Sequence, residues 1–278
     1  TDYPLDESGQ VILKQATSWQ EPVTQLELER VRLIETRLLV HQENGWQAIP
    51  YVWNKEQTEA QLALGGDWIS LNTNSNIAPN QVDHATSQSF DYIVPDANQC
   101  AGCHATDHSS GEPIPIGPKA RHLNVKLNHN GSPIHQLSYW QQTGKLNGEI
   151  SHFINQSNTA NTEAASQLEQ QARAYLDINC AHCHSRTGPA DTSGLFLSID
   201  TSDARSLGVC KPPVAAGKGS GGHQYAIVPG DAAHSIMTYR MRSQNPGEMM
   251  PELGRSLVHW EGVQLIENWI NELIGNCS

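Results

Sequence analysis

The chain has 278 residues, with 17 lysine and arginine residues against 29 aspartate and glutamate residues, which gives a formal net charge of −12. This negative charge argues against binding to nucleic acid or to an anionic membrane surface. The length allows one or two domains with hydrophobic cores, and no apolar run approaches the roughly 20 residues that a membrane-spanning helix needs.

The part of the chain before Cys100 is predicted to consist mostly of strands and loops. Two extended runs are separated by Asn44-Gly45, which is a strong hairpin signal. Three tryptophans in the strands are expected in the core, because strand aromatics are more often buried than stacked on a ligand. They are Trp46, Trp53 and Trp68. The predicted strands cover 9–14, 32–40, 46–53, 61–64 and 68–71, and residues 72–99 are predicted to be a loop.

This loop leads to Cys100-Ala101-Gly102-Cys103-His104, which has the C-x-x-C-H spacing of covalent c-type haem attachment. In this chemistry the thiols of Cys100 and Cys103 add to the two vinyl groups of one haem. The histidine that follows, His104, ligates the iron.

The middle of the chain carries few signals. A proline-rich loop covers 111–118, and a helix is predicted at 134–146. The run 156–162 is polar and featureless, so we place a domain boundary there. The predicted domains are therefore 1–157, with the first haem, and 163–278.

The second domain is predicted to begin with a helix at 163–179, which leads directly into a second C-x-x-C-H motif. Its Cys180 and Cys183 would bind a second haem, and His184 the iron. Zinc ribbons also contain two C-x-x-C pairs, but these are about 15–20 residues apart, whereas 76 residues separate Cys103 from Cys180. A thioredoxin-like pair needs a βαβ pattern, which is not evident. We therefore predict two covalently bound haem c groups.

The rest of the second domain is predicted to be loop and helix. A long loop at 204–222 contains a glycine-rich run, but this run lacks the Gly-Lys-Ser/Thr ending of a phosphate-binding loop. A short helix is predicted at 235–242. A terminal helix at 258–273 has an apolar stripe at helical spacing.

Met250 is the predicted second axial ligand of the second haem. All four methionines lie in the second half of the chain, and Met250 is followed by Pro251, Gly254 and Leu257 just before the terminal helix. Many small c-type cytochromes present their axial methionine in such a segment, where the proline stiffens the loop that holds the soft thioether towards the iron. Met249 is the alternative, and ordinary core packing is a further interpretation of both residues.

The second axial ligand of the first haem stays open, because the first half contains no methionine. His122 follows the first motif at a plausible reach. Met241 from the second domain and a five-coordinate iron are the other options. The histidine candidates of the first half are His41, His84, His108, His122, His129, His135 and His152.

The six cysteines include two that belong to neither motif, Cys210 and Cys277. Covalent haem is attached outside the inner membrane, in a compartment that tolerates disulfides. We therefore predict a disulfide between these two cysteines and a periplasmic or secreted protein. No signal-peptide pattern is evident, so we expect a mature chain.

Several segments carry a resemblance to a known family. They are ETRLLV, GWQAIPYVWN, QCAGCH, IGPKARHLN, YLDINCAHCH, VAAGKGSGG, YAIVPGD, SIMTYRM and EMMPELGRSLVHWEG. In these segments the chain resembles a group of bacterial secreted dihaem c-type cytochromes, and its second half resembles a class I cytochrome c domain. The resemblance implies an α+β fold, with a β-rich N-terminal haem domain followed by a mainly α cytochrome c-like domain. It also supports the Cys210–Cys277 pairing.

Two covalent haems in one chain predict an electron carrier that exchanges electrons with redox partner proteins, rather than an enzyme. The first rival is a dihaem peroxidase or oxidase, in which a His/Met haem takes up electrons and the other haem has an open side. The missing methionine in the first half fits that arrangement. The second rival is a haem-based sensor with an open first haem.

Overall fold

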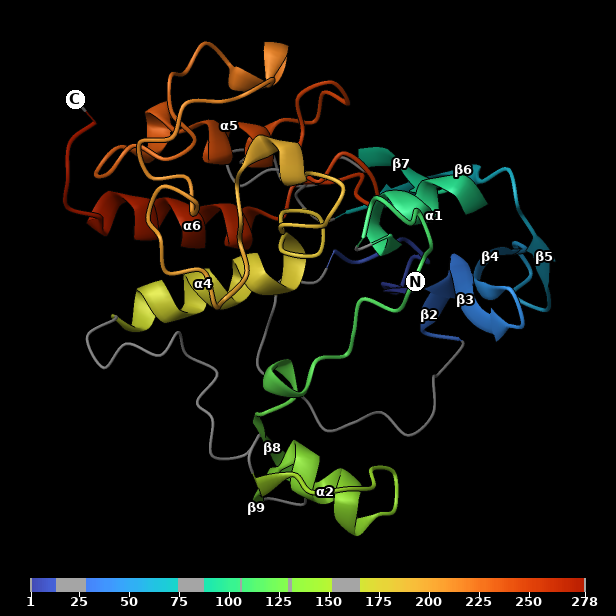
Figure 1. The fold of residues 1–278 in the computed structure, drawn as a ribbon. Helices are drawn as coiled ribbons and strands as arrows, with labels where there is room; N and C mark the ends of the chain where they lie inside the picture. The colour runs from blue at the N-terminus through green and yellow to red at the C-terminus, as the bar shows by residue number, and fades with distance from the viewer. Residues whose placement is uncertain are drawn as a thin grey trace.

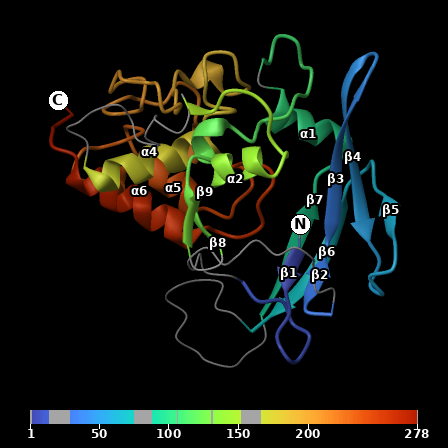
Figure 2. The same ribbon diagram turned by 90° about the horizontal axis from the view of Figure 1, so that it is seen from below.

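The computed structural model shows a mixed α+β fold (Figures 1 and 2). Helices α4 (Gln167–Asn179), α5 (Ile236–Arg242) and α6 (Trp260–Glu272) gather on one side, and the strands that precede Cys100 lie on the other. The structure describes residues 2–13, 29–74, 88–105, 107–129, 132–151 and 166–277. The predicted domain boundary at 156–162 lies outside these residues.

The predicted hairpin is confirmed. Strand β3 (Glu35–Gln42) pairs antiparallel with β4 (Gly45–Trp53), and the register brings Gln42 opposite Gly45. Gly45 has a φ of +106°, a conformation that residues with a Cβ rarely adopt. This tight turn therefore favours glycine at position 45. Strand β5 (Ala60–Leu62) then extends the sheet on the other side of β4.

Two further antiparallel pairs complete this half. Strand β1 (Asp2–Pro4) pairs with β2 (Val31–Leu33), and β6 (Asp67–Thr73) pairs with β7 (Gln88–Val94). Strand β7 lies in the stretch that the sequence predicted as loop, so that prediction was wrong there.

The predicted strands at 9–14 and 32–40 also differ from the structure. Val11 forms only isolated bridges, to Leu5 and Thr73, within the described residues. The run 32–40 is divided at Ile34, because β2 pairs with β1 in one sheet and β3 pairs with β4 in another.

The core of this half contains Val11, Ile34, Leu71 and Phe90, and Leu257 of the second half packs against it. Trp68 does not join this core. It is 68% exposed, because its neighbour Ile69 and Leu71 take the inward face of β6 and side chains alternate along a strand. Core burial was therefore the wrong expectation for Trp68, while Trp46 and Trp53 are half-buried.

The first motif lies on α1, and a small hairpin and a short helix follow it. These elements are α1 (Ala97–His104), β8 (Lys126–His129), β9 (Ser132–His135) and α2 (Gln136–Gln142). Asp96 and Gln99 form a capping box at the start of α1, which satisfies two backbone N–H groups of the first turn. The predicted helix at 134–146 is shorter in the structure: β9 takes its first two residues, and α2 ends at Gln142, before a turn.

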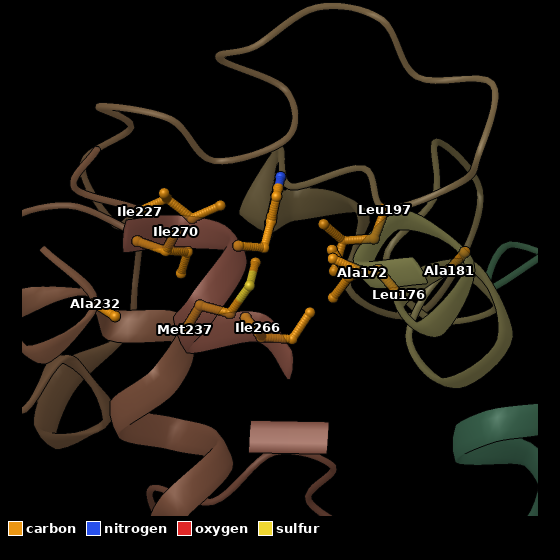
Figure 3. Packing of buried hydrophobic residues seen from close by; sticks show 10 residues of the cluster. Ala172, Leu176, Ala181, Leu197, Ile227, Ala232, Met237, Ile266 and Ile270 are labelled. Carbon is orange, nitrogen blue, oxygen red and sulfur yellow. The ribbon is translucent and has the colours of Figure 1, made fainter. Parts of the chain in front are cut away.

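The second half contains α4 (Gln167–Asn179), α5 (Ile236–Arg242) and α6 (Trp260–Glu272), within the predicted helices at 163–179, 235–242 and 258–273. Figure 3 shows side chains of their common core, including Leu176 of α4 and Ile266 of α6. Each of these two side chains is at most 1% exposed, and burying such a side chain contributes about 2 kcal/mol. Among the residues that the structure describes, no helix is both long and apolar enough to cross a membrane.

The predicted disulfide is confirmed. Cys210 and Cys277 are bonded, with their Cα atoms 5.2 Å apart. The bond joins the long loop after the second motif to the segment that follows α6.

Candidate haem-attachment sites

The second motif forms a compact turn at the end of α4. Cys180 ends the helix, and its carbonyl accepts hydrogen bonds from the backbone N–H groups of Cys183, at 3.2 Å, and His184, at 2.9 Å. This turn holds the two thiols and the imidazole of the motif in one short stretch of backbone.

A cavity of about 570 Å³ lies beside this turn, within the size range of ligand and cofactor sites. Its lining is mostly apolar, with few polar groups, and includes Leu176 and Val263 of the second-half helices. The second motif and the methionines supply Cys180, Cys183, His184, Met237, Met241 and Met250 to this lining, which also includes Cys103, His182 and His259. Two thiols, an imidazole and thioethers around one apolar cavity are the groups that a c-type haem needs, so these residues fit it.

His184 is neutral at physiological pH, because burial and the nearby Arg240 lower its pKa to about 4. A neutral imidazole is the form that ligates a metal. Ser193 Oγ lies 3.4 Å from Nδ1 of His184, and such a contact to one ring nitrogen orients the other. Burial also raises the pKa of the Cys180 thiol to about 12, so that this sulfur is protonated in the haem-free chain.

Met250 lines this cavity, whereas Met249 is buried but does not line it. The Met250 N–H donates to the carbonyl of Arg240, at 2.9 Å. The guanidinium of Arg255 donates to the carbonyls of Met241, at 3.1 Å, and Arg240, at 3.2 Å. These contacts fasten the loop that carries Met250 to the end of α5. Apart from its closeness to Met250 along the chain, no sequence pattern pointed to this role of Arg255.

The first motif has a different environment. Cys100 is buried, and this burial raises the pKa of its thiol. His104 Nδ1 lies 2.9 Å from the carbonyl of Ile114, which fixes the tautomer with Nδ1 protonated and leaves Nε2 available to a metal. A second cavity, of about 780 Å³, lies between α1 and β4, but it is lined by Ala97, Asn98 and Ala101 and not by the cysteines or the histidine of the motif.

The candidate ligands of the first haem are scattered. His122 is engaged elsewhere, because its Nε2 lies 2.6 Å from Oδ2 of Asp177. Met241 lines the cavity of the second motif. His84 and His152 lie outside the described residues. The second axial ligand of a haem at the first motif therefore stays unassigned.

Asp177 joins the first half of the chain to α4. Its side chain is 1% exposed and accepts hydrogen bonds from Arg121, at 2.7 and 2.9 Å, from His122, and from the backbone N–H of Ile199. A buried carboxylate with four donors is stabilised in its charged form, and these partners lower the pKa of Asp177 to about 2. The carboxylate three residues before Cys180 thus fixes the IGPKARHLN segment against the helix of the second motif.

We expect Asp177→Asn to lower the free energy of unfolding by about 2 kcal/mol at pH 7, since the pKa lies about 2 units below that of an exposed aspartate. The folded pKa is depressed, so the contribution is present above about pH 4 and is lost as the pH falls towards 2. Denaturant unfolding between pH 7 and pH 2 measures this. The exposed Asp200→Asn is the matched control, and equal pH profiles for the wild type and Asp177→Asn would contradict the assignment.

The structure also brings the two motifs together, which the sequence did not reveal. The ligand atoms of Cys103, His182 and Cys183 lie within 4.8 Å of one another. The Cys183 thiol donates to the carbonyl of Gly102, at 3.5 Å. The pKa of Cys103 is lowered to about 4 by hydrogen bonds from Cys183 and His182.

Comparisons of the chain with models of protein families, with curated proteins and with solved structures found no match.

Proposed function

We propose that the chain is a dihaem c-type cytochrome that carries electrons in the periplasm or outside the cell. The observation that carries this proposal is the apolar cavity in which Cys180, Cys183, His184 and Met250 meet. A haem bound there would supply one-electron chemistry at its iron, and His/Met ligation raises its potential. The chain itself contributes two thiols for attachment, a neutral imidazole, a thioether on a loop held by backbone contacts, and a mostly apolar lining.

The first motif supports the other haem of the proposal, the first haem. Cys100, Cys103 and His104 have the attachment spacing, and the contact from His104 Nδ1 to Ile114 orients the imidazole as a metal-ligating histidine requires. We assign the two haems to a β-rich first domain and a class I cytochrome c-like second domain, in a protein of the secreted dihaem family that the sequence resembles. Its partners would be redox proteins that deliver and accept single electrons.

One observation favours a second candidate function. His122 is bound to Asp177, so the histidine candidate nearest to the first motif along the loop is engaged by another residue in this arrangement. An iron at His104 with an open sixth position would suit a peroxidase or oxidase, or a haem-based sensor. The spectrum of the ferric protein separates these cases, because an open site is high-spin, whereas two low-spin haems favour plain electron transfer.

We expect the intact mass of protein made with the cytochrome c maturation machinery to exceed the 30.5 kDa of the polypeptide by two haems. The pyridine haemochrome spectrum should be of the c type, because both vinyl groups are consumed by thiols. The Cys100→Ser/Cys103→Ser variant should carry only the haem of the second motif. The Cys180→Ser/Cys183→Ser variant should carry only the haem of the first motif. A bare polypeptide mass, or zinc in place of iron, would end the proposal.

A further inference from the structure

The two attachment sites lie closest to each other at the second cysteine of each C-x-x-C motif. Cys103 Sγ and Cys183 Sγ lie within 4.8 Å of each other, although 79 residues separate them in the sequence. The contact from the Cys183 thiol to the Gly102 carbonyl also joins the two motifs directly. Each of these two sulfurs is an atom that would bond to a haem.

The first motif also forms part of the wall of the cavity beside the second motif. Gly102 and Cys103 line that cavity together with Cys183. A Cβ at Gly102 would lie 3.3 Å from Leu253, which belongs to the loop after Met250, so the two segments pack closely. Anything that fills the cavity of the second motif would therefore lie against the attachment point of the first.

Other contacts hold this arrangement in place. The backbone N–H of His108, just after the first motif, donates to the carbonyl of Thr187, at 2.8 Å, just after the second. Arg121 and His122 bind Asp177 on α4. Several independent contacts thus fix the first motif to the second, so the closeness of the two sulfurs does not depend on one side chain.

We propose that Cys103 and Cys183 carry adjacent thioether bonds, so that the two attachment sites form one coupled redox centre rather than two independent ones. This inference rests on the proposed function. Reduction of either iron from ferric to ferrous takes up one electron and removes one positive charge. Because the attachment points touch, that change in charge lowers the tendency of the other iron to accept an electron, and the effect is reciprocal.

A potentiometric titration of the holoprotein, compared with the two single-haem variants, tests the coupling. The variants are Cys100→Ser/Cys103→Ser and Cys180→Ser/Cys183→Ser. We expect the second electron to bind about tenfold less tightly than the single-haem variants predict, within the roughly 5- to 150-fold range that is typical of coupled sites. Tenfold corresponds to about 59 mV for one electron. A titration curve equal to the sum of the two variants would overturn the inference.

A second measurement needs no variant, in case one of them does not fold. Two ferric irons with touching attachment points should broaden each other's electron paramagnetic resonance signals, and the broadening should disappear in half-reduced samples. Signals that keep the same width as the protein is reduced would overturn the coupling while leaving the proposed function intact. A protein without haem, by contrast, would fail the mass measurement first, so the two failures are distinguishable.

Discussion

In Met250→Ala we expect the ferric protein to lose the weak far-red charge-transfer band of a methionine-ligated haem. Met250 lines the cavity that His184 also lines, and its backbone N–H donates to the carbonyl of Arg240, so its loop is held at the second site. Removal of the side chain opens the position to water or a small ligand. The absorption spectrum of the oxidised holoprotein, and its response to an added ligand such as imidazole, measure this loss.

Met249→Ala is the matched control, since Met249 is the adjacent residue and is buried, 8% exposed, but does not line the cavity. We expect it to retain the band and to lose only stability, by about 2 to 5 kcal/mol for a buried methionine. If Met249→Ala removes the band and Met250→Ala keeps it, the ligand is Met249. If both keep it, Met237 or Met241, which also line the cavity, is the ligand.

Met250→His should keep the second site six-coordinate but lower its midpoint potential. A neutral thioether favours ferrous iron relative to a second imidazole, and axial ligands set haem potentials over a range of about 0.8 V. An unchanged potential in this variant would argue against ligation through position 250. The three substitutions together therefore separate the identity of the ligand from damage to the fold.

Much of this fold could be predicted because the helices, the hairpin and the haem motifs are each encoded by residues close together in the sequence. The C-x-x-C-H spacing, Asn44-Gly45 and the apolar stripes of α4 and α6 each lie within a few turns of chain. The disulfide followed from cysteine parity. Strand β7 was missed because its pairing with β6 depends on residues about 20 positions away, and no hairpin turn signal was recognised between them.

The relation between the two motifs could not be predicted from the sequence. The closeness of Cys103 and Cys183 depends on how α1 packs beside the turn at the end of α4, and no short-range pattern encodes that packing. Asp177 gave a partial signal, since an acidic residue next to Leu176 on the buried side of a helix requires a partner. Which basic residues would supply that partner, Arg121 and His122, depends on the path of the loop after α1.

We expect loss of the Cys210–Cys277 disulfide to destabilise the protein by about 4 kcal/mol. The bond closes a loop between residues 67 positions apart, and the chain-entropy model gives about this value for a loop of that length. The experiment is denaturant unfolding of Cys210→Ser/Cys277→Ser with both haems attached. The double variant avoids a lone thiol that could form bonds between molecules.

The effect should reach the cavity as well as the global stability. The residues directly after Cys210, from Lys211 to Val214, line the cavity of the second motif, and the disulfide anchors the start of that segment to the chain end beyond α6. Ligand-binding rates at the second site should therefore rise in the double variant. The far-red band should persist, because His184 and Met250 lie on other segments.

Wild-type protein unfolded in the presence of a thiol reductant is the control for the serine substitutions themselves. It should approach the stability of the double variant, since both lack the cross-link. If the free energy of unfolding of the double variant lay within about 0.5 kcal/mol of that of the oxidised wild type, the prediction would be wrong. The disulfide would then add no constraint to the unfolded chain beyond that of its other covalent attachments. The proposed haems would be such attachments, because each would tie its two cysteines in the unfolded state too. They lie outside the loop from 210 to 277, however, so we expect the disulfide to act independently of them.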